Sequence, residues 1–188
     1  MNEKEIVRRM KASAKGSGCK VWRSGLNVLV LCGGGWCFAC RWEDCPPAVL
    51  GLIAQWLHGL PAPNSGFWYM GYDKPDPLYT QPPELDELLN RTEGEDLILA
   101  KIQVDGLQMA QSGSRSVYWF DAGFTAMLGR LETTGGGVLL PPADPEAMPW
   151  GRWSDKDGNA LFLEAESRIP RSTTAKLEAL DCWEVDRI

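Results

Sequence analysis

The chain has no long apolar run and only one histidine. No window of its 188 residues approaches the roughly eighteen consecutive apolar residues that a membrane-spanning helix needs. Residues 1–16 are charged and amphipathic, and they lack the apolar core of a signal peptide. We therefore expect a cytoplasmic protein without a membrane partner, in which the cysteines stay as thiols by default.

The familiar linear motifs of catalysis are also missing. The sequence contains no G-x-S-x-G elbow, no G-x-x-x-x-G-K-[ST] loop and no H-E-x-x-H pair. Any Ser-His or Cys-His mechanism would have to use His58, which stands at the end of an expected helix. The helix dipole there favours the cationic imidazole, so a helix-capping role is the better interpretation. We predict no catalytic residues, and a hydrolase or transferase without a linear motif is the third alternative for the function.

Positive charge is scarce except near the start of the chain. The net charge is -6, yet residues 1–23 hold seven Lys or Arg against two Glu, whereas residues 73–105 hold nine Asp or Glu against three Lys or Arg. A domain with this balance has no overall positive field to attract phosphates, which argues against direct nucleic-acid binding. A protein partner with a basic surface fits the acidic middle better.

Hydrophobic residues make up 44% of the chain, which is enough for one domain spanning residues 1–188. The pattern predicts an α+β fold, an antiparallel β-sheet with two to four helices packed against it, because no long helix separates successive strands as a parallel crossover requires. Residues 3–14 have helical spacing with a narrow apolar stripe, so residues 1–18 are expected at the domain's edge, free to move. A stronger helix begins at Pro46-Pro47 and stops at Gly59.

The strands are predicted from alternation and from glycine turns. Residues 26–32 and 36–42 flank Gly33-Gly34-Gly35 as a hairpin, with Trp36, Phe38, Cys40 and Trp42 on its core face. Residues 96–105 form a strand with one face made of Ile98, Ala100, Ile102 and Val104. Further strands are expected in residues 20–23, 66–72 and 116–128 and in a hairpin over 150–166, helices over 83–91 and 173–183, and irregular connections over 74–83 and 135–149.

Four of the six cysteines are crowded into fourteen residues. Cys32, Cys37, Cys40 and Cys45 form the pattern C-x4-C-x2-C-x4-C, which offers four soft ligands for zinc but lacks two separated C-x2-C knuckles. The first three resemble the spacing in plant-type [2Fe-2S] ferredoxins, although no cysteine follows at the position of the fourth ligand. The favoured interpretation is structural: Cys32 and Cys37 face each other across the hairpin, and Cys40 lies on the opposite face as a small core residue.

Residues 155–166 resemble the loop of EF-hand calcium proteins. Asp155, Asp157, Asn159 and Glu166 occupy the first, third, fifth and twelfth positions, where such loops supply oxygen ligands. Ala160 stands where the loop needs glycine, and the flanking residues do not form helices of ordinary length. A β-hairpin about an Asp-Gly turn explains the same residues without a metal, so no cofactor is expected, with zinc the first metal candidate and calcium and iron-sulfur behind it.

Aromatic and acidic residues gather in the middle of the chain. Exposed acids can steer a basic partner toward a surface, and neighbouring aromatics can then anchor it. The residues expected to do so are Trp68, Tyr69, Tyr72, Asp73, Asp76, Tyr79, Glu84, Asp86 and Glu87. In gross character, small, acidic and tryptophan-rich, the chain is similar to inhibitor, immunity and anti-defence proteins of bacteria and phages. We expect a non-enzymatic protein-binding domain that blocks a macromolecular partner. The alternative function is a metal-binding module that uses Cys32 to Cys45, and the alternative explanation of the acidic residues is a solvated face without a partner.

Overall fold

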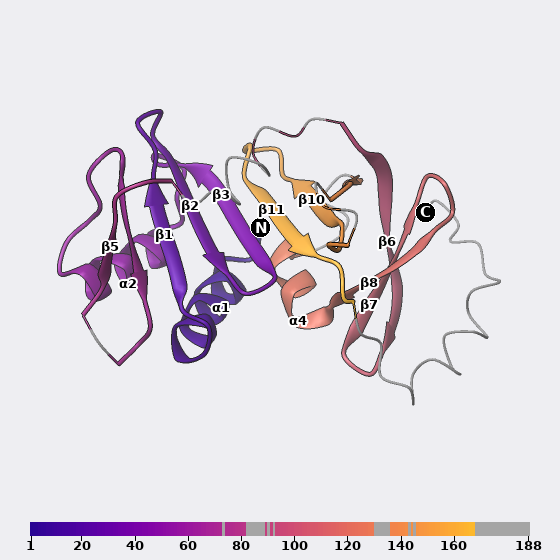
Figure 1. The fold of residues 1–188 in the computed structure, drawn as a ribbon, viewed down its shortest axis with the longest axis horizontal. Helices are drawn as coiled ribbons and strands as arrows, with labels where there is room; N and C mark the ends of the chain where they lie inside the picture. Colours follow the sequence, from indigo (N-terminus) through magenta and orange to yellow (C-terminus); the bar gives the residue numbers. More distant parts are fainter. Residues whose placement is uncertain are drawn as a thin grey trace.

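Eleven strands lie side by side in the computed structural model, which describes residues 1–72, 74–81, 89, 91, 93–129, 136–142, 144 and 146–167. They are β1 (Cys19–Arg23), β2 (Val28–Gly33), β3 (Trp36–Arg41), β4 (Ser65–Tyr69), β5 (Asp76–Leu78), β6 (Glu95–Val104), β7 (Leu107–Ser112), β8 (Val117–Asp121), β9 (Gly137–Leu140), β10 (Trp150–Ser154) and β11 (Ala160–Glu164). Their order in the sheet is β5-β4-β1-β2-β3-β11-β10-β9-β6-β7-β8. Neighbours run antiparallel throughout this order (Figure 1).

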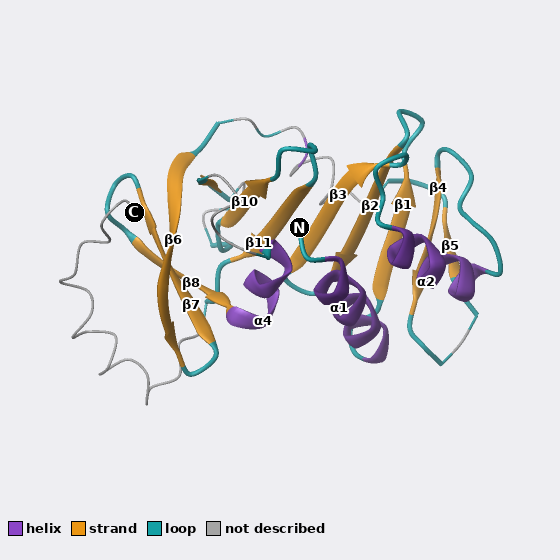
Figure 2. Cartoon of the chain, turned by 180° about the vertical axis from the view of Figure 1, so that it is seen from behind, coloured by secondary structure: helices purple, strands orange, loops and turns teal. Residues whose placement is uncertain are grey.

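The described helices cover one face of this sheet (Figure 2). They are α1 (Glu3–Lys15), α2 (Pro47–Leu57) and the four-residue α4 (Ala122–Thr125), which continues into the 3-10 turn η1 (Ala126–Leu128). The predicted α+β class is therefore correct in outline, but the sheet dominates and the helices are short. Within the described residues, no helix has both the length and the apolar character needed to cross a membrane.

Helix α1 forms where the sequence predicts it but lies elsewhere in the domain. The Asn2 side chain accepts a hydrogen bond from the Glu5 amide and caps the first turn, and Gly16 ends the helix. Ile6 and Met10 are completely buried, because the narrow apolar stripe fits between the sheet and the other helices. The expectation of a helix at the domain's edge is wrong: α1 is part of the core.

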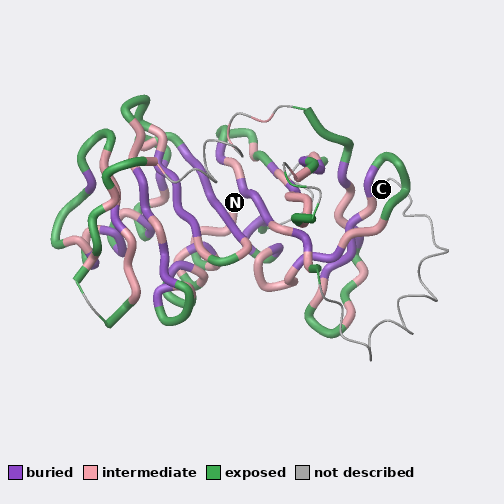
Figure 3. The backbone as a smooth tube through the Cα atoms, viewed as in Figure 1, coloured by how far each residue is buried: buried purple, intermediate pink, exposed green. Residues whose placement is uncertain are grey.

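The β2–β3 and β10–β11 hairpins follow the predicted alternation. Trp36, Phe38 and Cys40 point to the helix-covered face and belong to the main core, together with Leu161 and Leu163 of β11. The alternate residues of these strands form a second buried cluster on the opposite face, made of Val30, Cys32, Cys37, Ala39, Leu140 and Phe162. Both faces of the central strands are consequently apolar. Figure 3 shows that buried residues are concentrated along these strands.

Strand β6 departs from simple alternation. Its register against β7 shifts between Leu99 and Gln103, which is a β-bulge. Leu97, before the bulge, packs into the main core, whereas Ala100 packs with Met109 and Trp119 in a separate cluster under β6, β7 and β8. Ile102 and Val104 also pack against this cluster, so three of the four residues of the predicted face, Ala100, Ile102 and Val104, lie together.

Three short strands lie in segments that the sequence did not mark as strands. Both irregular connections contain one: β5 lies in the proline-rich residues 74–83, and β9 lies in residues 135–149. β7 was not predicted at all. The acidic helix expected over 83–91 falls almost entirely outside the described residues, and the closing helix over 173–183 lies outside them completely.

Candidate functional site

Strand β5 forms one end of the sheet and leaves its outer edge without a strand partner among the described residues. On its inner side it pairs with β4, through Gly66 with Leu78 and Trp68 with Asp76. Pro77 sits in this strand, as expected for an edge, because proline has no amide proton for a ladder on both sides. Tyr72 and Tyr79 flank the strand and are 80% and 85% exposed. An acidic side chain and two large exposed rings thus share the β5 edge.

The predicted aromatic residues do not all lie on that edge. The Tyr69 ring stacks on Trp56 of α2 with ring centroids 4.6 Å apart, so it packs beneath the helix. Trp68, the next residue along β4, points to the other face of the sheet and lines a pocket there. Of the predicted residues, Asp76 lies in β5, Tyr72 precedes this strand and Tyr79 follows it directly; Asp73, Glu84, Asp86 and Glu87 lie outside the described residues.

Two exposed leucines in loops were not singled out from the sequence. Leu26, at the β1–β2 turn, is 89% exposed, and Leu60, which follows α2, is 49% exposed. Leu26 stands between Gly25 and Asn27, and Asn27 has a positive φ of 58°. This turn composition could have indicated that a leucine there faces solvent.

A pocket of about 260 Å³ opens on the face opposite the helices. Cys32 and Cys37 are among the residues that line it, and the two are paired across β2 and β3 and joined as a disulfide. The prediction of a cross-strand pair is confirmed, while the expectation of free thiols is wrong for these two residues. The remaining lining residues are Ser17, Gly18, Lys20, Gly33, Gly34, Gly35, Trp68 and Trp150.

The other two residues of the cysteine cluster lie across the sheet from this pocket. Cys40 and Cys45 belong to the helix-side core, so the four cysteines do not converge on one point. A side-chain hydrogen bond with Cys45, together with burial, raises the pKa of Cys40 above its ordinary range. Among the described residues, no group of three or more His, Cys, Asp or Glu side chains has the arrangement of a metal site.

The calcium-like segment forms the turn of the β10–β11 hairpin. Asp155 accepts hydrogen bonds from the backbone amides of Asp157 and Asn159 and from the Asn159 side chain, which is the pattern of an Asx turn. Burial opposes ionisation, but these hydrogen bonds lower the pKa of Asp155. Glu166 lies beyond the far end of β11, where its backbone amide donates to the Trp119 carbonyl. The predicted first and last ligands are thus at opposite ends of one strand.

His58 takes the predicted capping position at the C-terminus of α2. It adopts a left-handed conformation with φ 54°, and its backbone amide donates to the Ala54 carbonyl. The capping is performed by the backbone, so it does not depend on the imidazole.

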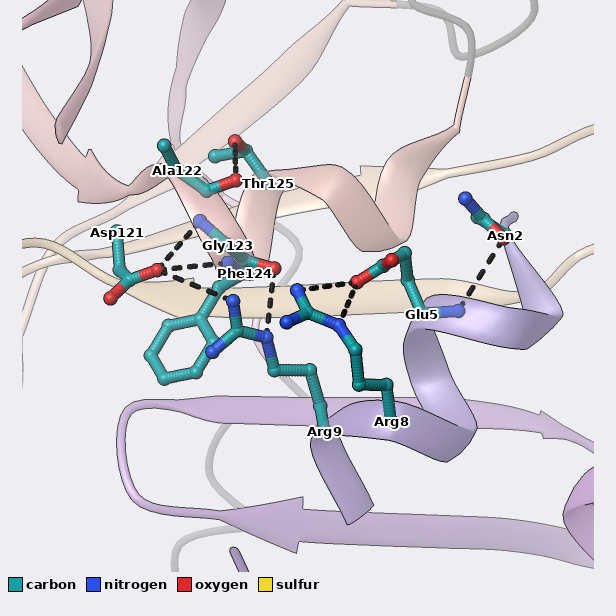
Figure 4. Close-up of polar contacts among 9 residues, drawn as sticks. All are labelled: Asn2, Glu5, Arg8, Arg9, Asp121, Ala122, Gly123, Phe124 and Thr125. Carbon is teal, nitrogen blue, oxygen red and sulfur yellow. Dashed lines mark hydrogen bonds and ion pairs between the residues drawn. The ribbon is translucent and has the colours of Figure 1, made fainter. Parts of the chain in front are cut away.

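A group of charges joins α1 to the end of β8 (Figure 4). The Arg9 Nε donates to the Gly123 carbonyl at 2.9 Å, and its guanidinium lies 3.8 Å from the Asp121 carboxylate and 4.9 Å from the centre of the Phe124 ring. Asp121 in turn accepts from the Gly123 and Phe124 amides and caps α4. These contacts give the charges of Arg9 and Asp121 a structural role, since they tie α1 to β8 and α4.

Two glutamates near this junction give the fold a pH dependence. Burial, and then the charge of Asp121, raise the pKa of Glu166; burial, and then the charge of Glu166, raise the pKa of Glu164. A raised pKa means that the folded state binds the proton more tightly than the unfolded chain does. The associated stability is fully present below the ordinary glutamate pKa of about 4.3 and is lost as the pH rises through the raised value.

We therefore expect Glu166→Gln to raise the melting temperature at pH 7. The gain in the free energy of unfolding should stay below about 1 kcal/mol, because the group is partly solvated. The difference from the unmodified protein should shrink at pH 4, where the glutamate is itself largely protonated. Thermal unfolding at both pH values measures this, and Glu43→Gln, at an exposed position between β3 and α2, serves as the control. An equal gain at both pH values would contradict the electrostatic explanation.

Comparison with known proteins adds no relative from which a function could be transferred. No protein-family model matches the chain, and no curated protein or solved structure is significantly similar to it.

Proposed function

We propose that this chain is a non-enzymatic protein-binding domain that captures a basic surface on a macromolecular partner through the β5 edge, defined as Tyr72, Asp76 and Tyr79. The observation that carries the proposal is the exposure of both tyrosines, at 80% and 85%, before and after a strand that ends the sheet formed by the described residues. Rings of this size are seldom left in solvent on both sides of one strand, and tyrosine is enriched among the residues that dominate binding energy at protein interfaces.

Charge supports the same edge. Asp76 is exposed on β5, and the sequence that follows carries Glu84, Asp86 and Glu87 within a chain of net charge -6. A negative surface accelerates the approach of a basic partner, and aromatic rings then contribute the short-range contact area. The outer side of β5, which no described strand covers, can in addition accept a strand of the partner. Blocking a partner in this way is the activity of inhibitor, immunity and anti-defence proteins, and it requires no catalytic group.

The test is quantitative capture from cell extract with matched baits. We expect the Tyr72→Ser/Tyr79→Ser double variant to retain its partner about thirtyfold less tightly, because two anchoring rings are removed. Asp76→Lys should weaken binding by roughly threefold to tenfold and make it less sensitive to salt. Asp157→Lys makes the same charge reversal at the β10–β11 turn, far along the sheet, and should leave binding unchanged.

Circular dichroism of each bait establishes that it remains folded. If all four baits retain the same proteins with the same affinity, the β5 edge is not the docking surface. If Asp157→Lys weakens capture as much as Asp76→Lys does, the effect comes from overall charge and the edge has no special part in it.

A further inference from the structure

The Cys32–Cys37 disulfide has a feature that a purely structural crosslink does not need: both of its residues line a pocket that opens to solvent. Its two residues are direct partners in the β2–β3 ladder, with Cα atoms 4.3 Å apart and a sequence separation of only five. Closing so short a loop removes little entropy from the unfolded chain, so the bond adds less stability than a long-range disulfide would. Stabilisation alone is therefore a weak reason for its presence.

The pocket gives an incoming group access to the sulfur atoms. One rim is the turn Gly33-Gly34-Gly35, which has no side chains to screen them, and the walls include the rings of Trp68 and Trp150. A volume of about 260 Å³ is large enough for the end of a cysteine side chain or a small thiol. Lys20 also lines the pocket, and a cation beside the site favours the thiolate form of an attacking group.

The remaining described cysteines do not line the pocket. Cys19, Cys40 and Cys45 are buried, free and packed in the helix-side core. Burial raises the pKa of Cys19 to about 12, so its thiol does not ionise near neutral pH. The sheet itself separates these three thiols from the pocket, and they cannot exchange with the Cys32–Cys37 pair without unfolding. Only the disulfide, among the described cysteines, is placed for reaction with an external thiol.

Opening the disulfide would leave the surrounding strands paired. β2 and β3 share six residue pairs with each other, and β2 also pairs with β1 while β3 pairs with β11. The hydrogen-bond ladders on both sides hold the hairpin in register whether or not the sulfur atoms are bonded. The bond can thus be broken and remade as a local event, which is the requirement for a redox centre that cycles.

We propose that Cys32–Cys37 is a redox-active disulfide that exchanges with an external dithiol entering the pocket between Trp68 and Trp150. The thiolate of the dithiol attacks Sγ of Cys32, the more exposed of the two residues at 8% against 3%. A mixed disulfide forms, the Cys32–Cys37 bond breaks, and its electron pair leaves on Cys37, which takes up a proton. The second thiol of the reagent then attacks the mixed disulfide and releases Cys32 as a thiol. The dithiol loses two electrons and two protons, and the cysteine pair gains them.

The proposal is tested on the full-length protein purified without reductant. It is equilibrated with dithiothreitol under native conditions, quenched with N-ethylmaleimide and digested with trypsin; residues 24–41 form one peptide that contains Cys32, Cys37 and Cys40. We expect labelling of Cys32 and Cys37 to rise together by about tenfold or more while Cys19, Cys40 and Cys45 stay unlabelled and the circular dichroism spectrum is unchanged. Removal of the reductant in air should restore the bond.

Two variants, each with one cysteine of the pair replaced, test which sulfur atom is attacked. In Cys37→Ser the thiol of Cys32 remains in the pocket, and with oxidised glutathione it should form a mixed disulfide several times faster than the thiol of Cys37 does in Cys32→Ser. The reverse order would overturn the assignment of attack to Cys32. Labelling of Cys32 and Cys37 only together with the buried cysteines and with loss of the spectrum would show a structural crosslink. Full labelling before any reductant is added would show that the pair does not form a disulfide. A structural crosslink and a missing disulfide would each overturn the proposal.

Discussion

The Trp36→Ala variant should lose about 3–5 kcal/mol of its free energy of unfolding, the cost of emptying a large site in a packed core. Trp36 is completely buried at the start of β3, on the helix-covered face. Its indole Nε1 donates to the Ser13 hydroxyl at 3.1 Å, so the ring also ties the sheet to the last turn of α1. Urea denaturation followed by circular dichroism gives the free energy directly.

Two further variants separate packing from the hydrogen bond. Ser13→Ala removes the acceptor of the indole proton and should cost about 1 kcal/mol. Trp36→Phe keeps most of the ring and should cost clearly less than alanine at the same position. If Trp36→Ala costs no more than Ser13→Ala, the core around this residue contributes little, contrary to its burial.

The Gly66→Val variant should lose about 1–3 kcal/mol and should detach β4 and β5 from the sheet. A Cβ atom at this position would overlap the Val21 carbonyl oxygen and the Trp22 ring. Because the Val21 carbonyl is backbone, it cannot swing aside as a flexible side chain could, and β4 must move. Gly66 pairs with Trp22 on one side and with Leu78 of β5 on the other, so both ladders should weaken. Amide hydrogen exchange of residues 65–69 and 76–78 should quicken in this variant.

Gly51→Ala is the matched control, since nothing lies within 4 Å of the Cβ atom that it adds on the exposed side of α2. Alanine in a helix interior should stabilise the protein by about 0.5–1 kcal/mol through its helix propensity. The proposed docking through the β5 edge should fail in Gly66→Val and persist in Gly51→Ala. Unchanged exchange in the β4 and β5 amides of Gly66→Val would mean that the strand accommodates the new side chain without moving.

Local patterns in the sequence predicted those elements whose signals lie within a few residues. The β2–β3 hairpin and the β10–β11 hairpin follow from alternation about a glycine-containing turn, and α1 follows from its spacing between Asn2 and Gly16. The cross-strand placement of Cys32 and Cys37 follows in the same way, because strand partners in a short hairpin are set by the turn. The short strands β5 and β9 were missed because a few residues among prolines or glycines carry too little periodicity.

The sequence by itself thus determined which residues of the β2–β3 hairpin share a face, where α1 and α2 begin and end, and which two cysteines oppose each other. Only the tertiary structure decided that β11 lies beside β3, with Leu161 opposite Phe38, that α1 is buried, and that β5 is an edge with Tyr72 and Tyr79 in solvent. It alone showed that the Cys32–Cys37 pair lines a pocket. Local propensity acts between residues close in sequence, whereas sheet order and exposure depend on which distant apolar faces bury each other best, and that choice is made by the whole chain at once.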